Sequence, residues 1–285
     1  MEIIGTIAEV RTAMRERRQA GLRVGLVPTM GFLHDGHVAL MKESNASCDV
    51  TVVSIFVNPT QFGQNEDLST YPRDLGRDER VCIEAGVDVL FVPTAAEIYP
   101  EEFQTFVEPG PLAEPLCGAI RPGHFRGVAT VVAKLLNIVQ PDAAFFGQKD
   151  YQQVAVVRRM VRDLDMPVEI VTVPTVREPD GLAMSSRNAY LSPSERERAT
   201  CISRGLFAAR AAFRGGEREA WKVLAIAGAE MGDVDSLQYL ELRDAETLEP
   251  LTDGVNRPGV LLAAAFVGST RLIDNVILED TPVRR

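Results

Sequence analysis

Short apolar runs alternate with segments of helical periodicity through residue 173 of the chain. The apolar runs are rich in β-branched residues and end at a proline or a polar loop, which is typical of buried strands. They predict five strands, at 23–28, 49–57, 87–92, 143–146 and 168–173. Apolar residues at helical spacing predict helices between them, at 37–45, 74–85, 126–139 and 151–164. This alternation indicates right-handed crossovers and a parallel sheet that is covered by helices on both faces.

The pattern changes beyond Arg187. Ser192-Pro-Ser-Glu195 predicts a helix start, with Ser192 as N-cap, Pro193 at the first helical position and Glu195 completing a capping box. This helix should run to about residue 213, and a second should cover 219–230. Three strand-like runs without crossover helices follow and should pair largely antiparallel, at 237–242, 260–267 and 272–278. We therefore expect an α/β protein with a Rossmann-like parallel-sheet domain at 1–176 and a smaller C-terminal α+β lid domain at 177–285.

Composition excludes several classes of protein. Hydrophobic residues make up 46% and charged residues 25% of the 285 residues, so a disordered chain is excluded. The net charge of −10 disfavours binding to nucleic acid. No apolar stretch reaches the roughly 18 residues that a membrane helix requires, and the N-terminus lacks the run of a signal peptide. Four cysteines without CxxC spacing argue against a zinc site or a disulfide framework, so we expect a reduced, cytosolic chain.

Candidate chemistry first appears where the first predicted strand ends, in Pro28-Thr-Met-Gly-Phe-Leu-His34-Asp-Gly-His37. Ligands of parallel α/β sheets bind at the carboxyl ends of the strands. His34 and His37 should share one side of the first helical turn, and the helix N-terminus behind them favours a phosphate group. The alternatives are a metal pair, for which only Asp35 offers a third ligand in register, or two capping histidines. We expect a nucleotide phosphate site.

Two further loops follow predicted strands. Asn58-Pro-Thr-Gln61 supplies two amides suited to a hydroxyl or a carboxylate, unless it is only a turn with a solvated Gln61. Gly147-Gln-Lys149-Asp150 places a lysine between a strand and a helix, where its charge suits phosphate oxygens. Asp150 has the alternative role of capping the helix that follows. Both loops are predicted to lie at the ligand-binding edge of the sheet.

The remaining candidates lie in longer loops. Met184-Ser-Ser-Arg187, near the predicted domain boundary, joins hydroxyls, backbone amides and a guanidinium in an anion clamp, or it is a surface loop with a stray arginine. His124 is a helix-cap feature or a residue on the substrate side. Tyr71 is a loop aromatic that could cover the pocket. Asp74 and Asp78 could hold a magnesium ion or form a solvated helix face.

The histidine loop resembles the HxGH signature of the nucleotidyltransferase superfamily, which cleaves ATP between its α and β phosphates. Four segments together resemble the pantothenate synthetase family, in the same order from about Ile7 to Ile277. Phe32 and Asp35 depart from that pattern, in which a small residue and a glutamate are commoner. The four segments are Pro28-Thr-Met-Gly, Val53-Ser-Ile-Phe-Val-Asn-Pro-Thr-Gln-Phe-Gly63, Phe145-Phe-Gly-Gln-Lys-Asp-Tyr-Gln-Gln153 and Gly181-Leu-Ala-Met-Ser-Ser-Arg-Asn188.

The resemblance implies an AMP-forming ligase. Pantoate would attack the α-phosphorus of Mg·ATP, and β-alanine would then attack the pantoyl-adenylate to give pantothenate and AMP. His34, His37 and Lys149 would stabilise the departing pyrophosphate. ATP would also contact Met30, Gly147, Asp150, Val176 (through its backbone), Met184, Ser185, Ser186 and Arg187. Gln61 would bind pantoate and also contact β-alanine, and Gln153 would bind pantoate. Asn58, Tyr71 and His124 are the further candidates for contacts with these substrates. No residue is assigned to a metal, and the family is typically homodimeric.

Two other functions stay open at this point. Another adenylyltransferase on the same sheet would release a stable dinucleotide product rather than AMP. A noncatalytic nucleotide sensor would bind ATP without exchanging pyrophosphate into it.

Overall fold

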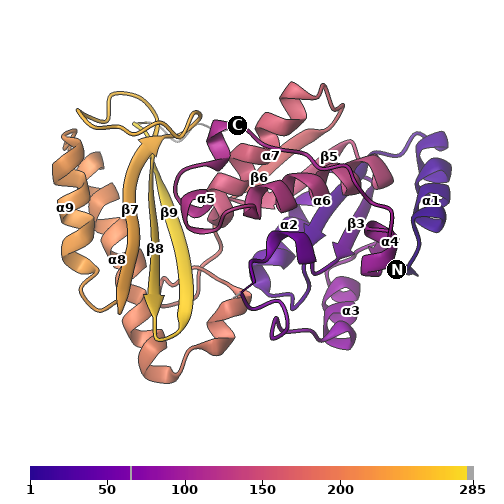
Figure 1. Ribbon diagram of the computed structural model, residues 1–285, viewed down its shortest axis with the longest axis horizontal. Coiled ribbons are helices and arrows are strands. Elements are labelled where there is room, and N and C mark those ends of the chain that lie inside the picture. The colour runs from indigo at the N-terminus through magenta and orange to yellow at the C-terminus, as the bar shows by residue number, and fades with distance from the viewer. Residues whose placement is uncertain (65, 281–285) are drawn as a thin grey trace. The chain divides into compact units, whose positions relative to one another are not determined.

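The computed structural model describes residues 1–64 and 66–280 (Figure 1). The chain forms two compact units. The first contains Met1–Gln148 and Gln152–Pro174, and the second contains Lys149–Tyr151 and the residues from Thr175 onward. The predicted domain boundary, between residues 176 and 177, lies close to the end of the first unit. It stays a prediction, because a compact unit need not be a domain that folds alone.

The first unit contains a six-stranded, fully parallel sheet with the strand order β1-β4-β3-β2-β5-β6. Its strands have the following bounds: β1 Glu2–Ile4, β2 Val24–Thr29, β3 Val50–Ile55, β4 Val89–Phe91, β5 Ala143–Gly147 and β6 Glu169–Val173. From β2 the chain moves outward to β3 and β4, and later returns to the other side of β2 to form β5 and β6. The topological switch point, where such sheets bind ligands, therefore lies between β2 and β5.

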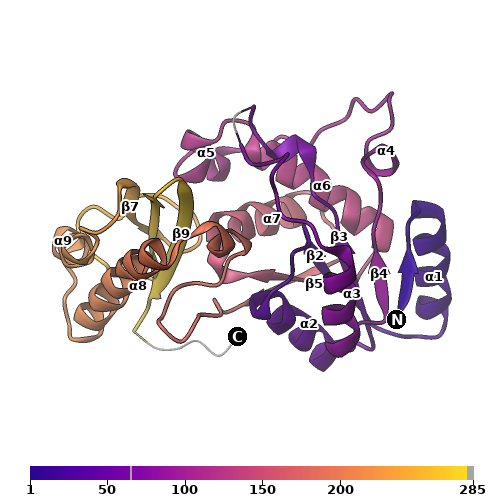
Figure 2. The same cartoon turned by 90° about the horizontal axis from the view of Figure 1, so that it is seen from below.

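Alternate residues of the strands build two cores, one on each face of the sheet. Leu26 and its neighbours pack with α6 and α7, whereas Val27 packs with Leu40 and Met41 of α2. Figure 2 shows α2 and α3 on one side of the sheet and α6 and α7 on the other. The helices have the following bounds: α1 Ile7–Gln19, α2 Asp35–Ser47, α3 Leu75–Glu84, α4 Ala95–Ile98, α5 Cys117–Ile120, α6 His124–Val139 and α7 Tyr151–Asp163.

The second unit packs two helices, α8 Pro193–Arg214 and α9 Ala220–Glu230, on an antiparallel sheet. Its strands are β7 Ser236–Asp244, β8 Gly259–Val267 and β9 Thr270–Leu278, in that order (Figure 1). Ser192 caps α8, and Glu195 completes the predicted capping box. The predicted fold class is confirmed: a parallel α/β sheet with a smaller α+β unit.

The sequence prediction missed β1, α1 and the short helices α4 and α5. Four short 3-10 turns complete the described elements: η1 Pro59–Gln61, η2 Pro111–Ala113, η3 Gln148–Asp150 and η4 Ser186–Tyr190. Helix α2 begins at Asp35 rather than at the predicted residue 37, because the side chain of His34 caps it. None of the helices within the described residues is both long and apolar enough to span a membrane.

Candidate active site

The two histidines follow the carboxyl end of β2, the central strand of the parallel sheet. His34 is the N-cap of α2, and His37 lies in its first turn. Their ring centroids are 4.1 Å apart, and both side chains are half-buried. The structure therefore places the pair at the switch point of the sheet, where the sequence predicted a phosphate site.

Hydrogen bonds to the backbone fix the tautomer of both rings. The Nδ1 atom of His34 accepts from the N–H of Gly36 at 3.1 Å, and the Nδ1 atom of His37 accepts from the N–H of His34 at 3.2 Å. A backbone N–H can only donate, so both Nδ1 atoms are unprotonated and each neutral ring carries its proton on Nε2. The capping role, which the sequence analysis treated as an alternative, thus makes Nε2 the protonated nitrogen of each neutral ring, and this is the atom that can donate to an anion.

Asn58 and Gln61 lie just beyond the carboxyl end of β3. The side chain of Asn58 is buried, with 1% exposed. Its Oδ1 atom accepts from the hydroxyls of Thr60 and Tyr99, each at 2.9 Å, so its Nδ2 atom must face the other way. Burial raises the pKa of Tyr99, which keeps that hydroxyl protonated as a donor.

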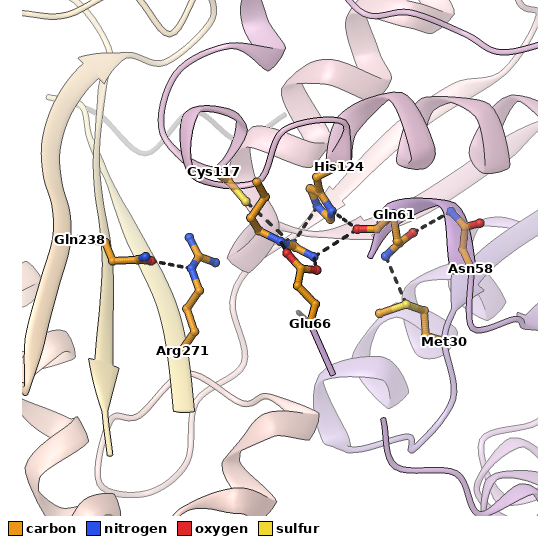
Figure 3. A network of polar contacts seen from close by, with 9 residues as sticks. Met30, Asn58, Gln61, Glu66, Cys117, His124, Gln238 and Arg271 are labelled. Atoms are coloured by element: carbon orange, nitrogen blue, oxygen red, sulfur yellow. Dashed lines mark hydrogen bonds and ion pairs between the residues drawn. The ribbon is translucent and has the colours of Figure 1, made fainter. Parts of the chain in front are cut away.

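The orientation of Asn58 determines that of Gln61. Asn58 Nδ2 donates to Gln61 Oε1 at 3.0 Å and to the carbonyl of Gly127 at 3.1 Å. Gln61 Nε2 consequently points toward Met30, whose sulfur lies 3.2 Å away (Figure 3). The oxygen of Gln61 accepts from Asn58 and one N–H of its Nε2 is directed at the Met30 sulfur, so the second N–H can donate to a carboxylate or hydroxyl oxygen of a substrate.

His124 acts on the backbone of Gln61 (Figure 3). Its Nδ1 atom lies 2.9 Å from the Gln61 carbonyl, and its Nε2 atom lies 3.1 Å from Nη1 of Arg121. A guanidinium can only donate, so Nε2 is the acceptor and Nδ1–H donates to Gln61. Both ring nitrogens therefore face the protein, which favours a positioning role over the direct substrate contact that was one of the two alternatives from the sequence.

Arg121 also forms an ion pair with Glu66. Its Nε and Nη2 atoms lie 2.7 and 2.5 Å from the two carboxylate oxygens, and both side chains are largely buried. Burial alone would raise the pKa of Glu66, but the bonds from Arg121 outweigh it and hold that pKa below its ordinary value. The pair thus stays ionised and ties the loop after η1 to the turn before α6.

Three other predicted residues of the first unit have distinct environments. Tyr71 is buried, with 6% exposed, and its ring packs edge-on against that of Phe62, with the ring centroids 6.0 Å apart. Its ring is therefore less accessible than the sequence analysis expected of an aromatic that covers a pocket. Gln153 is half-buried on α7. A Cβ added to Gly147, at the end of β5, would meet no atom within 4 Å, which leaves its backbone approachable.

The two adjacent glutamines of α7 differ. The side chain of Gln152 is 5% exposed and makes three hydrogen bonds to backbone groups, of Leu112, Pro115 and Cys117. Its amide is therefore fully used in holding that loop. Gln153, which the sequence analysis assigned to pantoate, is the one of the two that stays a candidate.

In the second unit, Lys149 and Asp150 lie in the 3-10 turn η3. The ammonium of Lys149 lies 3.8 Å from Asp150 Oδ1. The backbone carbonyl of Lys149 accepts from Asn275 Nδ2 at 3.0 Å. Asn275 is buried, with 1% exposed, so it anchors the backbone of the lysine to strand β9. Asp150 ends η3, and α7 begins at the next residue.

A hairpin in the second unit joins the predicted adenine and phosphate contacts. Met184 N–H donates to the carbonyl of Val176 at 3.0 Å. Arg177, inside the hairpin, forms a buried ion pair with Asp274 of β9, at 2.6 and 2.9 Å. Burial raises the pKa of Asp274, although Arg177 acts against this shift. The hairpin is therefore pinned to the sheet of its own unit.

The predicted anion clamp follows the hairpin directly. Ser185 caps the turn η4, since its hydroxyl accepts from the N–H of Arg187 at 3.3 Å. Ser186 and Arg187 lie in the first residues of that turn. Two hydroxyls, a guanidinium and the first amides of a turn are thus gathered in one short segment.

Asp78 matches neither of the two alternatives given for Asp74 and Asp78, whereas Asp74 is exposed, as a solvated helix face would be. Asp74 is the N-cap of α3 and accepts from the N–H of Arg77 at 3.0 Å. Asp78 is buried rather than solvated, with 1% exposed, and both of its oxygens accept from backbone N–H groups. Its carboxylate is therefore not free to bind a metal ion. Across the described residues, no three His, Cys, Asp or Glu side chains form a group that could hold one.

Several residues at these sites carried no signal in the sequence. Four of them, Tyr99, Thr60, Arg121 and Asn275, each contact a candidate residue, and Glu66 forms the ion pair with Arg121. Thr60 stood inside the segment Asn58-Pro-Thr-Gln61, but nothing in its spacing indicated which atoms it contacts.

Comparison with known proteins assigns these features to one family. The model of the pantoate-beta-alanine ligase family matches residues 2–277. A pantothenate synthetase 1 from Bradyrhizobium diazoefficiens is 64% identical over 282 residues, which are 99% of this chain and 100% of the relative. A pantothenate synthetase from Geobacter sulfurreducens is 54% identical over 280 residues, covering 98% and 99% of the two chains.

Solved structures agree with this similarity in sequence. The crystal structure of a pantothenate synthetase from Thermus thermophilus has a TM-score of 0.91 and 49% identity, covering 97% of this chain and 99% of the other. A pantoate-beta-alanine ligase from Francisella tularensis, complexed with beta-gamma ATP and beta-alanine, has a TM-score of 0.81 and 36% identity, covering 99% of each chain.

Proposed function

Because the chain belongs to the pantoate–β-alanine ligase family, we propose that it joins pantoate to β-alanine at the expense of ATP. The products are pantothenate, AMP and pyrophosphate, and a pantoyl-adenylate is the intermediate. The observation that carries the proposal is the pair of Nε2–H donors of His34 and His37 at the switch point, with the Gln61 amide at the end of the neighbouring strand.

In the first step, a carboxylate oxygen of pantoate attacks the α-phosphorus of ATP, and the bond to the bridging oxygen of pyrophosphate breaks. His34 and His37 donate from Nε2 to phosphate oxygens as charge moves onto the leaving group. An imidazolium would carry a second proton on Nδ1 and break the bond that orients the ring. The two histidines therefore act as neutral donors, without transferring a proton.

Gln61 orients pantoate in this step. The N–H of its Nε2 that is not directed at Met30 donates to an oxygen of the substrate, while its own oxygen accepts from Asn58. Asn58 and His124 both position Gln61. Asn58 bonds to the side-chain oxygen of Gln61, and His124 bonds to its backbone carbonyl. Tyr71 and Gln153 complete the pantoate side of the site.

Residues of the second unit bind the nucleotide. Lys149 supplies a point charge to phosphate oxygens, and Ser185, Ser186 and Arg187 bind the β and γ phosphates through hydroxyls, amides and the guanidinium. The backbone of Val176 and the neighbouring Met184 contact the adenine. The remaining contacts of ATP come from Met30, Gly147 and Asp150.

In the second step, the amine of β-alanine attacks the activated carbonyl and AMP leaves. A carboxylate would have to expel an oxide, whereas the adenylate expels a phosphate ester. This route requires no protein nucleophile, so positioning and charge stabilisation account for the catalysis.

Magnesium enters this proposal with the triphosphate. Mg²⁺ is commonly held by substrate phosphates and water together with one or two carboxylates. Asp78, which the sequence analysis named with Asp74 as a possible magnesium ligand, is buried, and both of its oxygens accept from backbone N–H groups. We therefore assign no protein ligand to the ion. A homodimer and a cytosolic location are likewise part of the proposal, and light scattering tests the first of these.

Two assays test the proposed reaction. Exchange of labelled pyrophosphate into ATP should require pantoate, and release of AMP should require β-alanine as well. His37→Ala should lower the exchange rate roughly 10²–10³-fold while the variant keeps the circular dichroism spectrum of the parent chain. ATP binding without exchange would instead support the nucleotide sensor, and a stable dinucleotide product would support the other adenylyltransferase.

A further inference from the structure

We propose that Asp78 is a positioning residue for this reaction, because its carboxylate fixes the loop that presents His34 and His37. The inference rests on the proposed function. Asp78 lies in α3, and its side chain is 1% exposed. Its Oδ2 atom accepts from the N–H of Phe32 at 2.7 Å, and its Oδ1 atom accepts from the N–H of Leu33 at 2.8 Å. One carboxylate therefore holds two consecutive amides of the histidine loop.

The loop has a backbone that needs such support. Gly31 and Phe32 both have positive φ angles, of 82° and 51°. A side chain in this left-handed region is strained, so the conformation at Phe32 persists only where its surroundings impose it. Asp78 accepts from the N–H of Phe32 itself and from the N–H of Leu33, the next residue. The guanidinium of Arg77, also on α3, lies 4.9 Å from the centre of the Phe32 ring and adds a second contact.

The fixed loop in turn fixes both imidazoles. Leu33 is fully buried, and the next residue, His34, begins the cap of α2. The N–H of His34 donates to Nδ1 of His37, and Nδ1 of His34 accepts from Gly36. A displaced loop would move the His34 N–H and loosen both contacts at once. Asp78 thus acts on the two donors through the backbone, without touching a substrate.

Only a carboxylate satisfies both amides. An asparagine of the same shape has one oxygen, and its NH₂ group would face the other backbone N–H donor to donor. Burial raises the pKa of Asp78, while the two N–H groups and Arg77 act in the opposite direction. Burying a charge is costly unless it is hydrogen-bonded, and these two amides supply the bonds.

The kinetic test uses Asp78→Asn with Asp142→Asn as its matched control. Asp142 accepts from the N–H of Val24 at 2.7 Å, at the opposite end of the strand that carries the loop. Asp78→Asn should lower kcat for pantoate-dependent pyrophosphate exchange roughly 10- to 100-fold, because small displacements of catalytic groups have effects of this size. Its KM for pantoate should stay within about twofold. Asp142→Asn should keep kcat within about twofold.

A second measurement detects the positioning directly. The chain has three histidines, so long-range ¹H–¹⁵N spectra report three rings. In the parent chain, His34 and His37 should show the Nε2–H tautomer and His124 the Nδ1–H tautomer. In Asp78→Asn, the first two should lose their tautomer preference while His124 stays unchanged. This readout does not depend on the reaction.

Where Asp78→Asn does not fold, Gly31→Ala provides another perturbation. Its Cβ would lie 3.0 Å from Asp78 Oδ2 and 3.0 Å from Ile55 Cγ2, at a φ that disfavours any side chain. It should reproduce the selective loss of kcat and of the tautomers. An unchanged kcat together with unchanged tautomers in a folded variant of either kind overturns the role of Asp78. Absence of exchange in the parent chain, with the expected tautomer change in the variant, overturns the proposed function alone.

Discussion

Asn58→Asp replaces one buried amide nitrogen by oxygen and leaves the shape of the side chain unchanged. The three donors on Oδ1, from the N–H and hydroxyl of Thr60 and the hydroxyl of Tyr99, keep their acceptor. The two bonds from Nδ2, to Gln61 and to the carbonyl of Gly127, are lost. The substitution therefore tests the donor side of Asn58 alone.

Two effects of different size follow from these lost bonds. The Gly127 carbonyl loses a buried partner, which should lower the free energy of unfolding by about 1–3 kcal/mol. Gln61 can regain a bond only by rotating its amide, so that Nε2 donates to the new carboxylate and Oε1 faces the substrate. A hydrogen bond to a charged group contributes about 1.5–3 kcal/mol. Since 1.4 kcal/mol is tenfold, kcat/KM for pantoate should fall by roughly 10- to 150-fold.

The assay measures AMP release while pantoate is varied at saturating ATP and β-alanine. The loss should lie mainly in pantoate, with KM for ATP changed by less than about twofold. Asn45→Asp is the control, because Asn45 also donates its amide to a backbone carbonyl, that of Ala85 at 2.7 Å. Pantoate kcat/KM within threefold of the parent value in folded Asn58→Asp would refute the reasoning, as would equal losses for pantoate and ATP.

Three further predictions concern other parts of the chain. Gly127→Ala should weaken pantoate binding and lower the melting temperature, because its Cβ would lie 2.4 Å from the carbonyl oxygen of Thr60 and push η1 away from α6. Calorimetry measures both the affinity and the melting temperature. An unchanged affinity for pantoate would contradict this prediction. Burial and nearby carboxylates raise the pKa of the Cys82 thiol to about 12, so iodoacetamide at pH 8 should label the half-exposed Cys48 and spare Cys82, as peptide mass spectrometry would reveal. Burial would raise the pKa of Asp244, but bonds from two backbone N–H groups and a guanidinium hold it below its ordinary value of 3.8. This carboxylate therefore stabilises the fold above that pH, and the stabilisation is lost as the pH falls through the lowered pKa. Urea unfolding should show Asp244→Asn less stable than the parent chain at pH 7, with the difference shrinking toward pH 3; a pH-independent difference would contradict the assignment.

Local signals in the sequence explain which parts of the fold were predictable. The strands at the centre of the sheet are buried on both faces, so their sequences are uninterrupted apolar runs. The capping box at Ser192 depends on residues within one helical turn. Strand β1, by contrast, has three residues, two of them exposed, and is a strand only because it pairs with β4, far along the chain. No local pattern could reveal it.

The residues of the candidate site likewise divide into those with a local signal in the sequence and those whose contacts depend on distant residues. His34, His37, Asn58 and Gln61 were identifiable because polar side chains follow predicted strands directly. Asp78 was misinterpreted because its two partners lie 45 and 46 residues earlier, so its spacing within α3 indicated only a helix face. The orientations of the Asn58 and His124 side chains were equally inaccessible, since each depends on a residue that the fold brings from elsewhere.

The ion pair between Arg177 and Asp274 has a consequence for the nucleotide contacts that we propose for Val176 and Met184. Arg177 also donates to the carbonyl of Gly181, and its guanidinium lies 4.6 Å from the ring centre of Phe207. These contacts preorganise the stretch from Val176 to Met184 within its own unit. A preformed binding segment loses little conformational entropy when a ligand arrives, so more of the gross interaction with adenine and phosphate remains as affinity.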